Sequence, residues 1–279
     1  MPELPEVETT LRGIRPALLN RRIADITVRN PALRIPVGDR IKVARGRVIN
    51  GLRRRAKYLL IDTPAPAGAK SGAEGGLMIH LGMSGSLRIC AANAPTRKHD
   101  HVDLVLEGGT VLRFNDPRRF GIFTWWDAPA ESHPLIRDLG PEPLGEAFTG
   151  TYLYRRSRGL RVSVKNFLMN ARVVVGVGNI YASEALHLAG IHPVRAAGRI
   201  AEPRYVALAE ATRSVLENAI RQGGTTLRDF TAPDSQPGYF AQELQVYDRA
   251  GAPCYRCGAP IRKRVIGQRS SYYCLGCQT

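Results

Sequence analysis

Residues 254–277 have the sequence CYRCGAPIRKRVIGQRSSYYCLGC, with two C-x2-C pairs separated by sixteen residues. This spacing is typical of a two-knuckle hairpin that brings four thiolates tetrahedrally around one zinc ion. Disulfide bonds are the alternative, and they are not favoured in a chain without an export signal. We expect one structural zinc ion whose closed shell leaves no position for catalysis. Its ligands are Cys254, Cys257, Cys274 and Cys277.

Basic residues outnumber acidic residues across the chain. There are 40 Lys and Arg against 24 Asp and Glu, which gives a net charge of +16 and a pI of about 10.2. Arg45–Lys57 and Cys254–Thr279 carry basic residues and no acid. Such stretches suit a phosphate backbone, although a solvated basic face is the alternative for either stretch alone. The expected partner is therefore a polyanion.

The length and composition predict a folded protein with more than one domain. At 279 residues the chain exceeds the usual size of one domain, and 44% hydrophobic with 23% charged residues is typical of soluble globular proteins. No apolar run is long enough to span a membrane, and the opening residues MPELPE do not resemble a signal peptide. We expect a cytoplasmic protein with no membrane partner.

Hydrophobic periodicity changes along the chain. After a short helix near the start, alternating segments up to about Trp126 predict a β-sandwich, and Cys90 at the end of one expected strand is interpreted as a buried core thiol. The Pro/Ala/Gly-rich residues 63–76 predict a surface loop. Helical patterns between 151 and 221 predict a second domain. The expected fold class is α+β, with domains 1–130, 151–240 and 241–279 and a linker over 131–150.

The start of the chain carries a candidate nucleophile. Methionine is readily removed before proline, which would leave Pro2 as a secondary amine with Glu3 and Glu6 close by. An α-amino group has a pKa near ~7.7–8.0 and is therefore partly unprotonated at neutral pH. Such an amine attacks a carbon at the aldehyde oxidation level and forms an iminium. A frayed terminus and acids placed for a helix dipole are the alternatives.

Ten blocks of sequence follow one another in a recognisable order. They are MPELPEVET (1–9), RRAKYLL (54–60), HLGMSGSLRI (80–89), KHDHVDLVL (98–106), DPRRFG (116–121), LGPEPL (139–144), VVGVGNIYASEAL (174–186), QGGTTLRDF (222–230), PGYFAQELQVY (237–247) and the cysteine tail. Together they resemble the bacterial formamidopyrimidine-DNA glycosylase family. The opening resembles this family more than its endonuclease VIII sister group, which typically has glycine where Leu4 stands.

The resemblance implies an enzyme of base excision repair. Members of the family remove oxidised purines such as 8-oxoguanine and formamidopyrimidines from duplex DNA, and then cut the strand by β- and δ-elimination. It implies that Pro2 is the nucleophile at C1′ and that Glu3 is the acid/base carboxylate, with Glu6 as a nearby support. The implied fold adds a helix-two-turn-helix motif to the second domain, and the implied zinc finger is a β-hairpin.

The resemblance also implies how the DNA is held. Lys57 corresponds to the lysine on the phosphate beside the lesion and is counted with the catalytic residues, and a loop over 223–240 closes over the oxidised purine. Periodicity alone would make Met83 and Phe120 core side chains, and Asn179 a helix N-cap. The residues implied to hold phosphate are His80, Asn179 and Arg269; those implied to fill the space left by the extruded base are Met83, Arg118 and Phe120; Lys165 is implied to lie near that base.

Two other functions remain as alternatives. One is a zinc-ribbon module that binds DNA without cutting it, and the Pro2-Glu3 pair argues against it. The other is an endonuclease VIII-like glycosylase for oxidised pyrimidines, which lesion preference would distinguish. We expect a monomer that binds one zinc ion and lesion-containing double-stranded DNA, in the bacterial cytoplasm at the nucleoid.

Overall fold

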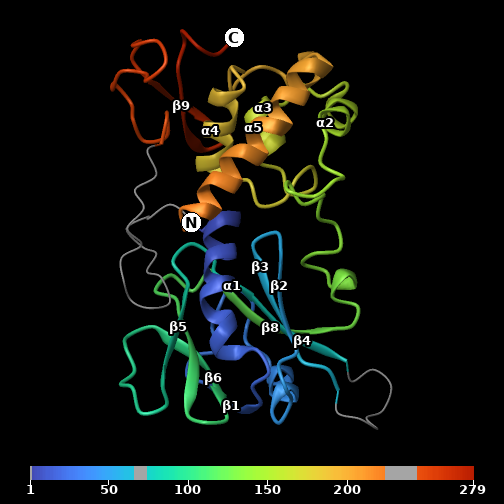
Figure 1. The fold of residues 1–279 in the computed structure, drawn as a ribbon, viewed down its shortest axis with the longest axis vertical. Coiled ribbons are helices and arrows are strands. Elements are labelled where there is room, and N and C mark those ends of the chain that lie inside the picture. Colours follow the sequence, from blue (N-terminus) through green and yellow to red (C-terminus); the bar gives the residue numbers. More distant parts are fainter. Residues whose placement is uncertain (1, 66–73, 224–243) are drawn as a thin grey trace. The chain divides into compact units, whose positions relative to one another are not determined.

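A computed structural model describes residues 2–65, 74–223 and 244–279 of the chain (Figure 1). Its contacts divide the chain into two units. The first contains residues 2–65, 74–138 and 223, and the second contains residues 139–222 and 244–279. No helix in these described ranges is both long and apolar enough to cross a bilayer.

Helix α1 (Leu4–Leu18) opens the first unit, as the sequence predicts. Glu3 is its N-cap residue, and the Glu6 side chain accepts a hydrogen bond from the Glu3 backbone N–H at 2.8 Å. A proline in the first turn and this capping contact favour a helix start. The helix buries its apolar face in the core of the unit. That face consists of Val7, Leu11, Ile14 and Leu18.

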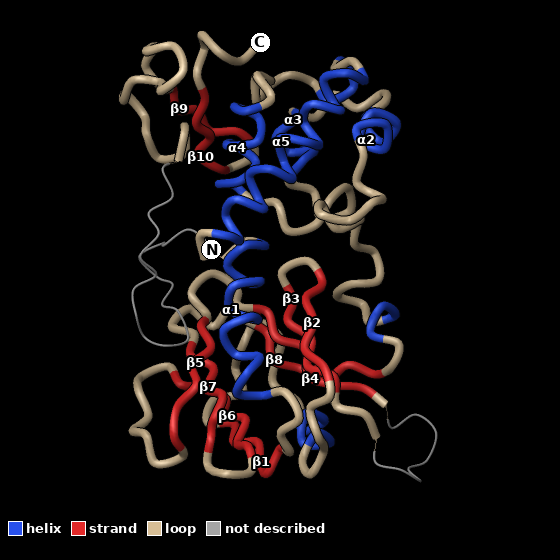
Figure 2. Tube along the Cα trace, in the orientation of Figure 1, coloured by secondary structure: helices blue, strands red, loops and turns tan. Residues whose placement is uncertain are grey.

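Two four-stranded antiparallel sheets complete the first unit, in the orders β1-β6-β7-β5 and β2-β3-β4-β8 (Figure 2). The strands are β1 (Ile23–Val28), β2 (Gly51–Arg55), β3 (Tyr58–Asp62), β4 (Gly75–His80), β5 (Ser86–Ala91), β6 (Asp100–Leu106), β7 (Thr110–Asn115) and β8 (Ile122–Asp127). Apolar side chains from both sheets and from α1 share one core. This arrangement is the predicted β-sandwich. Two short 3₁₀ helices, Asp39–Ala44 and Ala130–Ser132, lie in its connections.

The consecutive arginines of β2 hide the apolar alternation that predicts the sandwich elsewhere. Two local predictions for the first unit are wrong. Gly75 and Gly76 lie in β4, although 63–76 is predicted as a loop. A Cβ at Gly76 would lie 2.0 Å from the Ile61 carbonyl oxygen, so glycine permits this close strand contact. Cys90 is partly exposed because β5 is an edge strand, so it is not a core thiol.

The second unit is helical, with a terminal hairpin. Its helices are α2 (Gly150–Ser157), α3 (Val164–Leu168), α4 (Asn179–Leu188) and α5 (Glu202–Arg221), with a 3₁₀ turn at Ala197–Arg199. A turn over 171–173 and a bend over 174–176, with Gly176 at φ 80°, separate α3 from α4, where the resemblance implies a helix-two-turn-helix motif. The long helix α5 packs against α2 and α4.

The hairpin consists of β9 (Arg262–Ile266) and β10 (Arg269–Tyr273), paired antiparallel. Gly267 and Gln268 connect them with φ values of 56° and 64°, which is the backbone of a tight type I′ hairpin turn. Beneath the hairpin lies a small core of Val246, Cys254, Ile261, Tyr272 and Cys274. Strand β10 packs against α4. The α+β class and the terminal zinc-finger hairpin are therefore confirmed.

Candidate active site and zinc centre

Pro2 and Glu3 immediately precede the first turn of α1. Both are buried, with Glu3 2% exposed. Because the buried Glu6 carboxylate accepts the Glu3 backbone N–H, the peptide that carries Pro2 and Glu3 is fixed to the helix start. The amide dipoles at this end of a helix favour negative charge. Glu6 therefore orients the backbone of Glu3.

Arg54 connects α1 to the turn that carries Lys57. Its Nε donates to Glu8 Oε2 at 3.0 Å, and its Nη1 donates to the carbonyl oxygen of Ala56 at 2.9 Å. Ala56 has a φ of 56°, a left-handed conformation that alanine seldom adopts. The Arg54 contact thus stabilises an unfavourable turn between β2 and β3. Lys57 follows directly, so its backbone has a defined position relative to α1.

His80, the last residue of β4, is a neutral ring with a defined tautomer. The Gly82 backbone N–H donates to Nδ1 at 3.0 Å, so the ring proton is on Nε2. The Tyr58 ring lies 4.8 Å from the His80 ring, centre to centre. Burial, and then the positive charges of Lys57 and Arg34, lower the pKa of His80 to about 4. At neutral pH, Nε2 is therefore an uncharged hydrogen-bond donor.

The lowered pKa predicts a pH-dependent stability. Between pH 6.5 and about 4 the unfolded chain protonates His80 while the folded chain does not, so stability falls as the pH falls. We expect His80 to lower the free energy of unfolding by about 2–3 kcal/mol from pH 7.5 to 4.5. Denaturant unfolding at both pH values should show this loss in the wild type and not in His80→Gln. Tyr58→Phe is the control, and an identical pH dependence in His80→Gln would contradict the assignment.

Two neighbouring loops of the first unit carry Met83, Arg118 and Phe120. Met83 follows β4, and the other two residues lie between β7 and β8. Phe120 is 45% exposed, and the Arg118 guanidinium lies 5.1 Å from the centre of its ring. Phe120 is therefore not the core residue that periodicity alone suggests. Together, the exposed ring and the cation provide a surface on which a base or sugar could stack.

Lys165, Asn179 and the hairpin form a second cluster, in the second unit. Lys165 is fully buried, and its Nζ donates to Asn179 Oδ1 and Ser271 Oγ, each at 2.5 Å. Asn179 Nδ2 donates to the carbonyl oxygen of Ser270 at 2.9 Å. Gly178 occupies the N-cap position, so Asn179 is the first residue of α4 and not its cap. These contacts join α3, α4 and β10, the strand that begins with Arg269.

Much of the basic stretch 45–57 is paired within the first unit. Arg53 forms ion pairs with Asp62 and Glu131, and Arg54 pairs with Glu8. Arg47 is buried and donates to the carbonyl oxygen of Thr63. The local absence of acids therefore does not leave these arginines unpaired. Strand β9, by contrast, exposes Arg262, Lys263 and Arg264.

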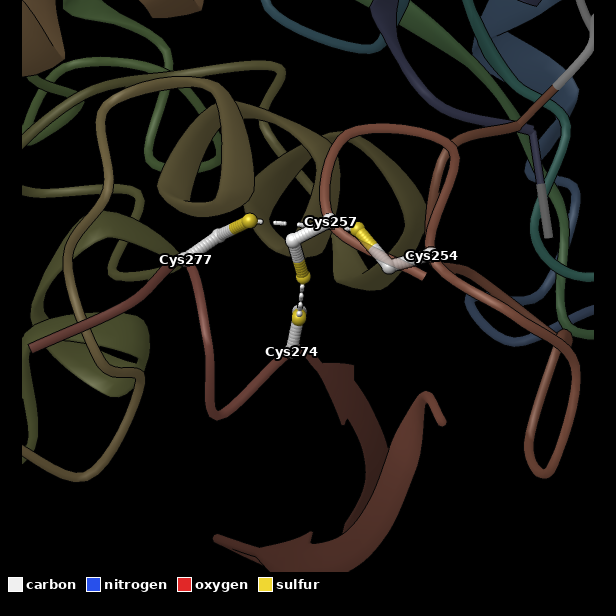
Figure 3. A group of neighbouring side chains, drawn as sticks. All are labelled: Cys254, Cys257, Cys274 and Cys277. Atoms are coloured by element: carbon white, nitrogen blue, oxygen red, sulfur yellow. Dashed lines mark hydrogen bonds between the residues drawn. The ribbon is translucent and has the colours of Figure 1, made fainter. Parts of the chain in front are cut away.

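The four cysteines converge on one point (Figure 3). All four Sγ atoms lie within 4.8 Å of one another, with 3.3 Å between Cys257 and Cys274 and 3.9 Å between Cys254 and Cys277. Zinc–sulfur bonds of about 2.3 Å place tetrahedral sulfurs roughly 3.8 Å apart, so the set fits one zinc ion. Burial, and then the neighbouring cysteines, raise the pKa of Cys277 to about 12. A bound cation is what stabilises four thiolates at this spacing.

Loss of this zinc should unfold the hairpin. Structural zinc supplies about 10–16 kcal/mol of folding free energy in zinc-finger peptides, far more than the small core beneath β9 and β10 can replace. We expect Cys257→Ser to lose stoichiometric zinc, to lose hydrogen-exchange protection over 262–273 and to bind DNA more weakly. Metal analysis, exchange and a binding titration test this, with Cys90→Ser as control. Full zinc content with a protected hairpin in Cys257→Ser would contradict it.

Two residues that act on the site in the structure are not among the site residues predicted from the sequence. The Arg34 charge acts on His80, although Arg34 lies far away in sequence. The Glu184 carboxylate on α4 accepts the backbone N–H groups of three consecutive residues at 2.8–3.0 Å, and it thereby holds the start of the zinc-bearing segment. An acid inside the apolar pattern of α4 is the signal that could have identified it. The three residues are Gln245, Val246 and Tyr247.

The predicted site residues form separate groups in the two units. The first unit contains Pro2, Glu3, Glu6, Lys57, His80, Met83, Arg118 and Phe120; the second contains Lys165, Asn179, Arg269 and the four cysteines. Within each unit the contacts above connect many of them. The predicted closing loop 223–240 lies outside the described residues except for its first position.

Comparisons with known proteins agree along the whole chain. The formamidopyrimidine-DNA glycosylase N-terminal domain matches residues 1–123, the H2TH domain of that glycosylase matches 139–231, and a zinc finger found in FPG and IleRS matches 251–279. A formamidopyrimidine-DNA glycosylase from Syntrophotalea carbinolica is 56% identical over 279 residues, which is all of both chains.

Solved structures show the same similarity. The MutM (FPG) protein from Thermus thermophilus matches with a TM-score of 0.86 and 39% identity, covering 99% of this chain and 98% of its own. A Lactococcus lactis FPG mutant in complex with DNA that contains Fapy-dG matches with a TM-score of 0.88 and 32% identity, covering all of both chains.

Proposed function

The chain belongs to the formamidopyrimidine-DNA glycosylase family, and from this premise we propose that Pro2 and Glu3 carry out its chemistry. The protein is a DNA glycosylase that removes oxidised purines from duplex DNA in base excision repair, with the lyase activity typical of the family. The observation that supports the roles of Pro2 and Glu3 most directly is their fixed, buried position at the start of α1.

The proposed reaction begins at the amine of Pro2, freed by removal of Met1. Its nitrogen lone pair attacks C1′ of the damaged nucleotide, and the bond to the base breaks with the electron pair leaving on the base, which takes up the proton released from the Pro2 nitrogen. Protonated Glu3 then gives its proton to the sugar ring oxygen as the ring opens, which leaves an iminium between Pro2 and C1′ and Glu3 as a carboxylate. Removal of a C2′ proton expels the 3′ phosphate, and removal of a C4′ proton in a second elimination expels the 5′ phosphate. Water hydrolyses the remaining iminium, which frees Pro2 and leaves a one-nucleotide gap.

Each unit contributes DNA contacts in this proposal. In the first unit, Lys57 and the neutral Nε2–H of His80 contact the phosphate beside the lesion; in the second unit, Asn179 and Arg269 contact backbone phosphate. Such contacts position the backbone and carry no sequence information. A base must leave the stack before it can be reached, and Met83, Arg118 and Phe120 fill the space it leaves. Lys165 fixes Asn179 and β10 and lies near the extruded base.

The proposed organisation assigns these roles to domains. Residues 1–130 form the catalytic sandwich, 131–150 the linker, 151–240 the helix-two-turn-helix domain with its lesion-capping loop, and 241–279 the zinc finger. One chain acts on one lesion. Because the matched relatives are bacterial, we place the enzyme in the bacterial cytoplasm, associated with the nucleoid.

Lesion preference tests the proposed function. We expect single-turnover excision of 8-oxoguanine opposite cytosine to exceed excision of thymine glycol opposite adenine by at least about tenfold, because a purine site loses contacts with the smaller ring. Both duplexes should share one flanking sequence, and an undamaged duplex is the control. The reverse preference would favour the endonuclease VIII-like alternative, and binding without excision would favour a non-catalytic DNA-binding protein.

A further inference from the structure

We propose that Asp116 and Ser84 are positioning residues that join two loops and thereby preassemble the side chains of Met83, Arg118 and Phe120. These three side chains are called the filling set below. The inference rests on the proposed function, because it takes the filling set to occupy the space left by the extruded base. It adds two residues that do not themselves enter that space.

The Asp116 carboxylate reaches both loops at once. Asp116 is fully buried. Its Oδ1 accepts hydrogen bonds from Ser84 Oγ at 2.7 Å and from the Arg118 backbone N–H at 3.3 Å, and its Oδ2 accepts the Gly121 backbone N–H at 2.7 Å. Ser84 belongs to the loop after β4, whereas the other two donors lie on either side of Phe120. One side chain therefore fixes the start and the end of the second loop and connects it to the first.

Ser84 closes the network between the loops. Its Oγ donates to Asp116 and also accepts the Arg118 backbone N–H at 3.2 Å. The backbones meet without side chains between them, because a Cβ on Gly82 would lie 2.5 Å from the Phe120 carbonyl carbon. Gly82 also has a φ of 63°, which favours glycine. The two loops therefore pack as one body.

Asp116 is itself anchored to the sheet. Its backbone N–H donates to the carbonyl oxygen of His99 at 3.0 Å, and its carbonyl oxygen accepts from Nε2 of the buried His101 at 2.8 Å and from the Arg119 N–H at 3.2 Å. Because the main chain of Asp116 is held on both sides, its carboxylate is a fixed point. The loops are set by the sandwich and not by the DNA.

This arrangement explains how Phe120 can be 45% exposed on a loop and still have a defined position. Side chains that enter a duplex act best when their loops are ordered before binding, because ordering them afterwards would lower affinity and rate. We expect the network to matter most where a base must be extruded. An abasic nucleotide has no base to extrude and depends on it least.

The test compares two substrates across Asp116→Asn, Ser84→Ala and Ser84→Thr. Asparagine places an N–H donor where the carboxylate accepted a hydrogen bond. We therefore expect Asp116→Asn to excise 8-oxoguanine about 10–100-fold more slowly than wild type. Its rate of cutting at preformed abasic sites should stay within about twofold of wild type. Ser84→Ala should show the same selective loss, and Ser84→Thr, which keeps the hydroxyl, should restore excision. Because the two residues share one network, the double variant should be no slower than the slower single variant.

Matched controls separate the possible failures. Ser86→Ala, two residues further along on β5, should behave as wild type, and thermal unfolding checks that each variant is folded. If Asp116→Asn does not fold, the Ser84 pair carries the test. If Met83→Ala has no excision defect, the filling role that the proposed function gives to Met83 is wrong. The positioning role is wrong if Met83→Ala selectively slows 8-oxoguanine excision while folded Asp116 and Ser84 variants behave as wild type. It is also wrong if those variants slow excision and abasic-site cutting equally.

Discussion

Replacement of Glu3 by glutamine is expected to slow 8-oxoguanine excision by about 10²–10⁴-fold, the contribution typical of acid–base groups. Glutamine keeps the size of the side chain and loses its capacity to donate and recover a proton. Affinity for the lesion duplex should stay within about twofold, because binding depends on phosphate contacts made elsewhere. The expected defect is therefore in the chemical step.

Single-turnover excision at saturating enzyme, beside equilibrium binding to the same duplex, measures the two effects separately. Glu210→Gln makes the same change on the exposed face of α5 and should alter neither quantity. If Glu3→Gln bound the duplex weakly and saturating enzyme restored its excision rate, the carboxylate would be a positioning group.

Retention of a residue before Pro2 is expected to have the largest effect of all. An amide nitrogen is not a nucleophile, so a chain that keeps Met1 cannot form the iminium. Excision and strand cutting should fall together by at least about 10³-fold, while binding to the DNA persists. Mass spectrometry gives the processed fraction of each preparation, and activity should scale with that fraction. An extension of equal length at Thr279 is the control, and full activity in fully unprocessed protein would contradict the proposed nucleophile.

The cysteine hairpin could be predicted from the sequence because ligand spacing alone determines it. Two C-x2-C pairs need only a reversal of the chain to meet, and the turn at Gly267 provides one. Helix α1 could be predicted equally well, since its capping residues and apolar face are local in sequence. The sandwich as a whole could be predicted from alternation, although arginines interrupt the pattern of β2.

Properties that arise from distant residues could not be predicted. The neutral state of His80 depends on burial and on the charges of Lys57 and Arg34, and its tautomer depends on the Gly82 N–H; the pattern of β4 reveals none of these. In the same way, Arg54 belongs to a stretch without acids and yet pairs with Glu8. Charge patterns along a sequence do not record which charges the fold brings together.

The filling set illustrates both what the sequence could predict and what it could not. DPRRFG was recognisable as a block, but periodicity gave no reason to expect Phe120 on the surface. The connection of this block to Ser84 through the Asp116 carboxylate is a tertiary contact, and it becomes visible only when both loops are placed.

Borohydride reduction during the reaction tests the central claim most directly. Reduction converts an iminium into a stable amine, so enzyme and DNA remain covalently joined only if an amine of the protein has reached C1′. The experiment uses the Met1-processed chain on a duplex with 8-oxoguanine opposite cytosine, followed by digestion and mass spectrometry of the cross-linked peptide. The account predicts a stoichiometric adduct whose nucleotide remnant is on the nitrogen of Pro2. An adduct on Lys57, Lys165 or another internal lysine, or no adduct while the base is released, would contradict it.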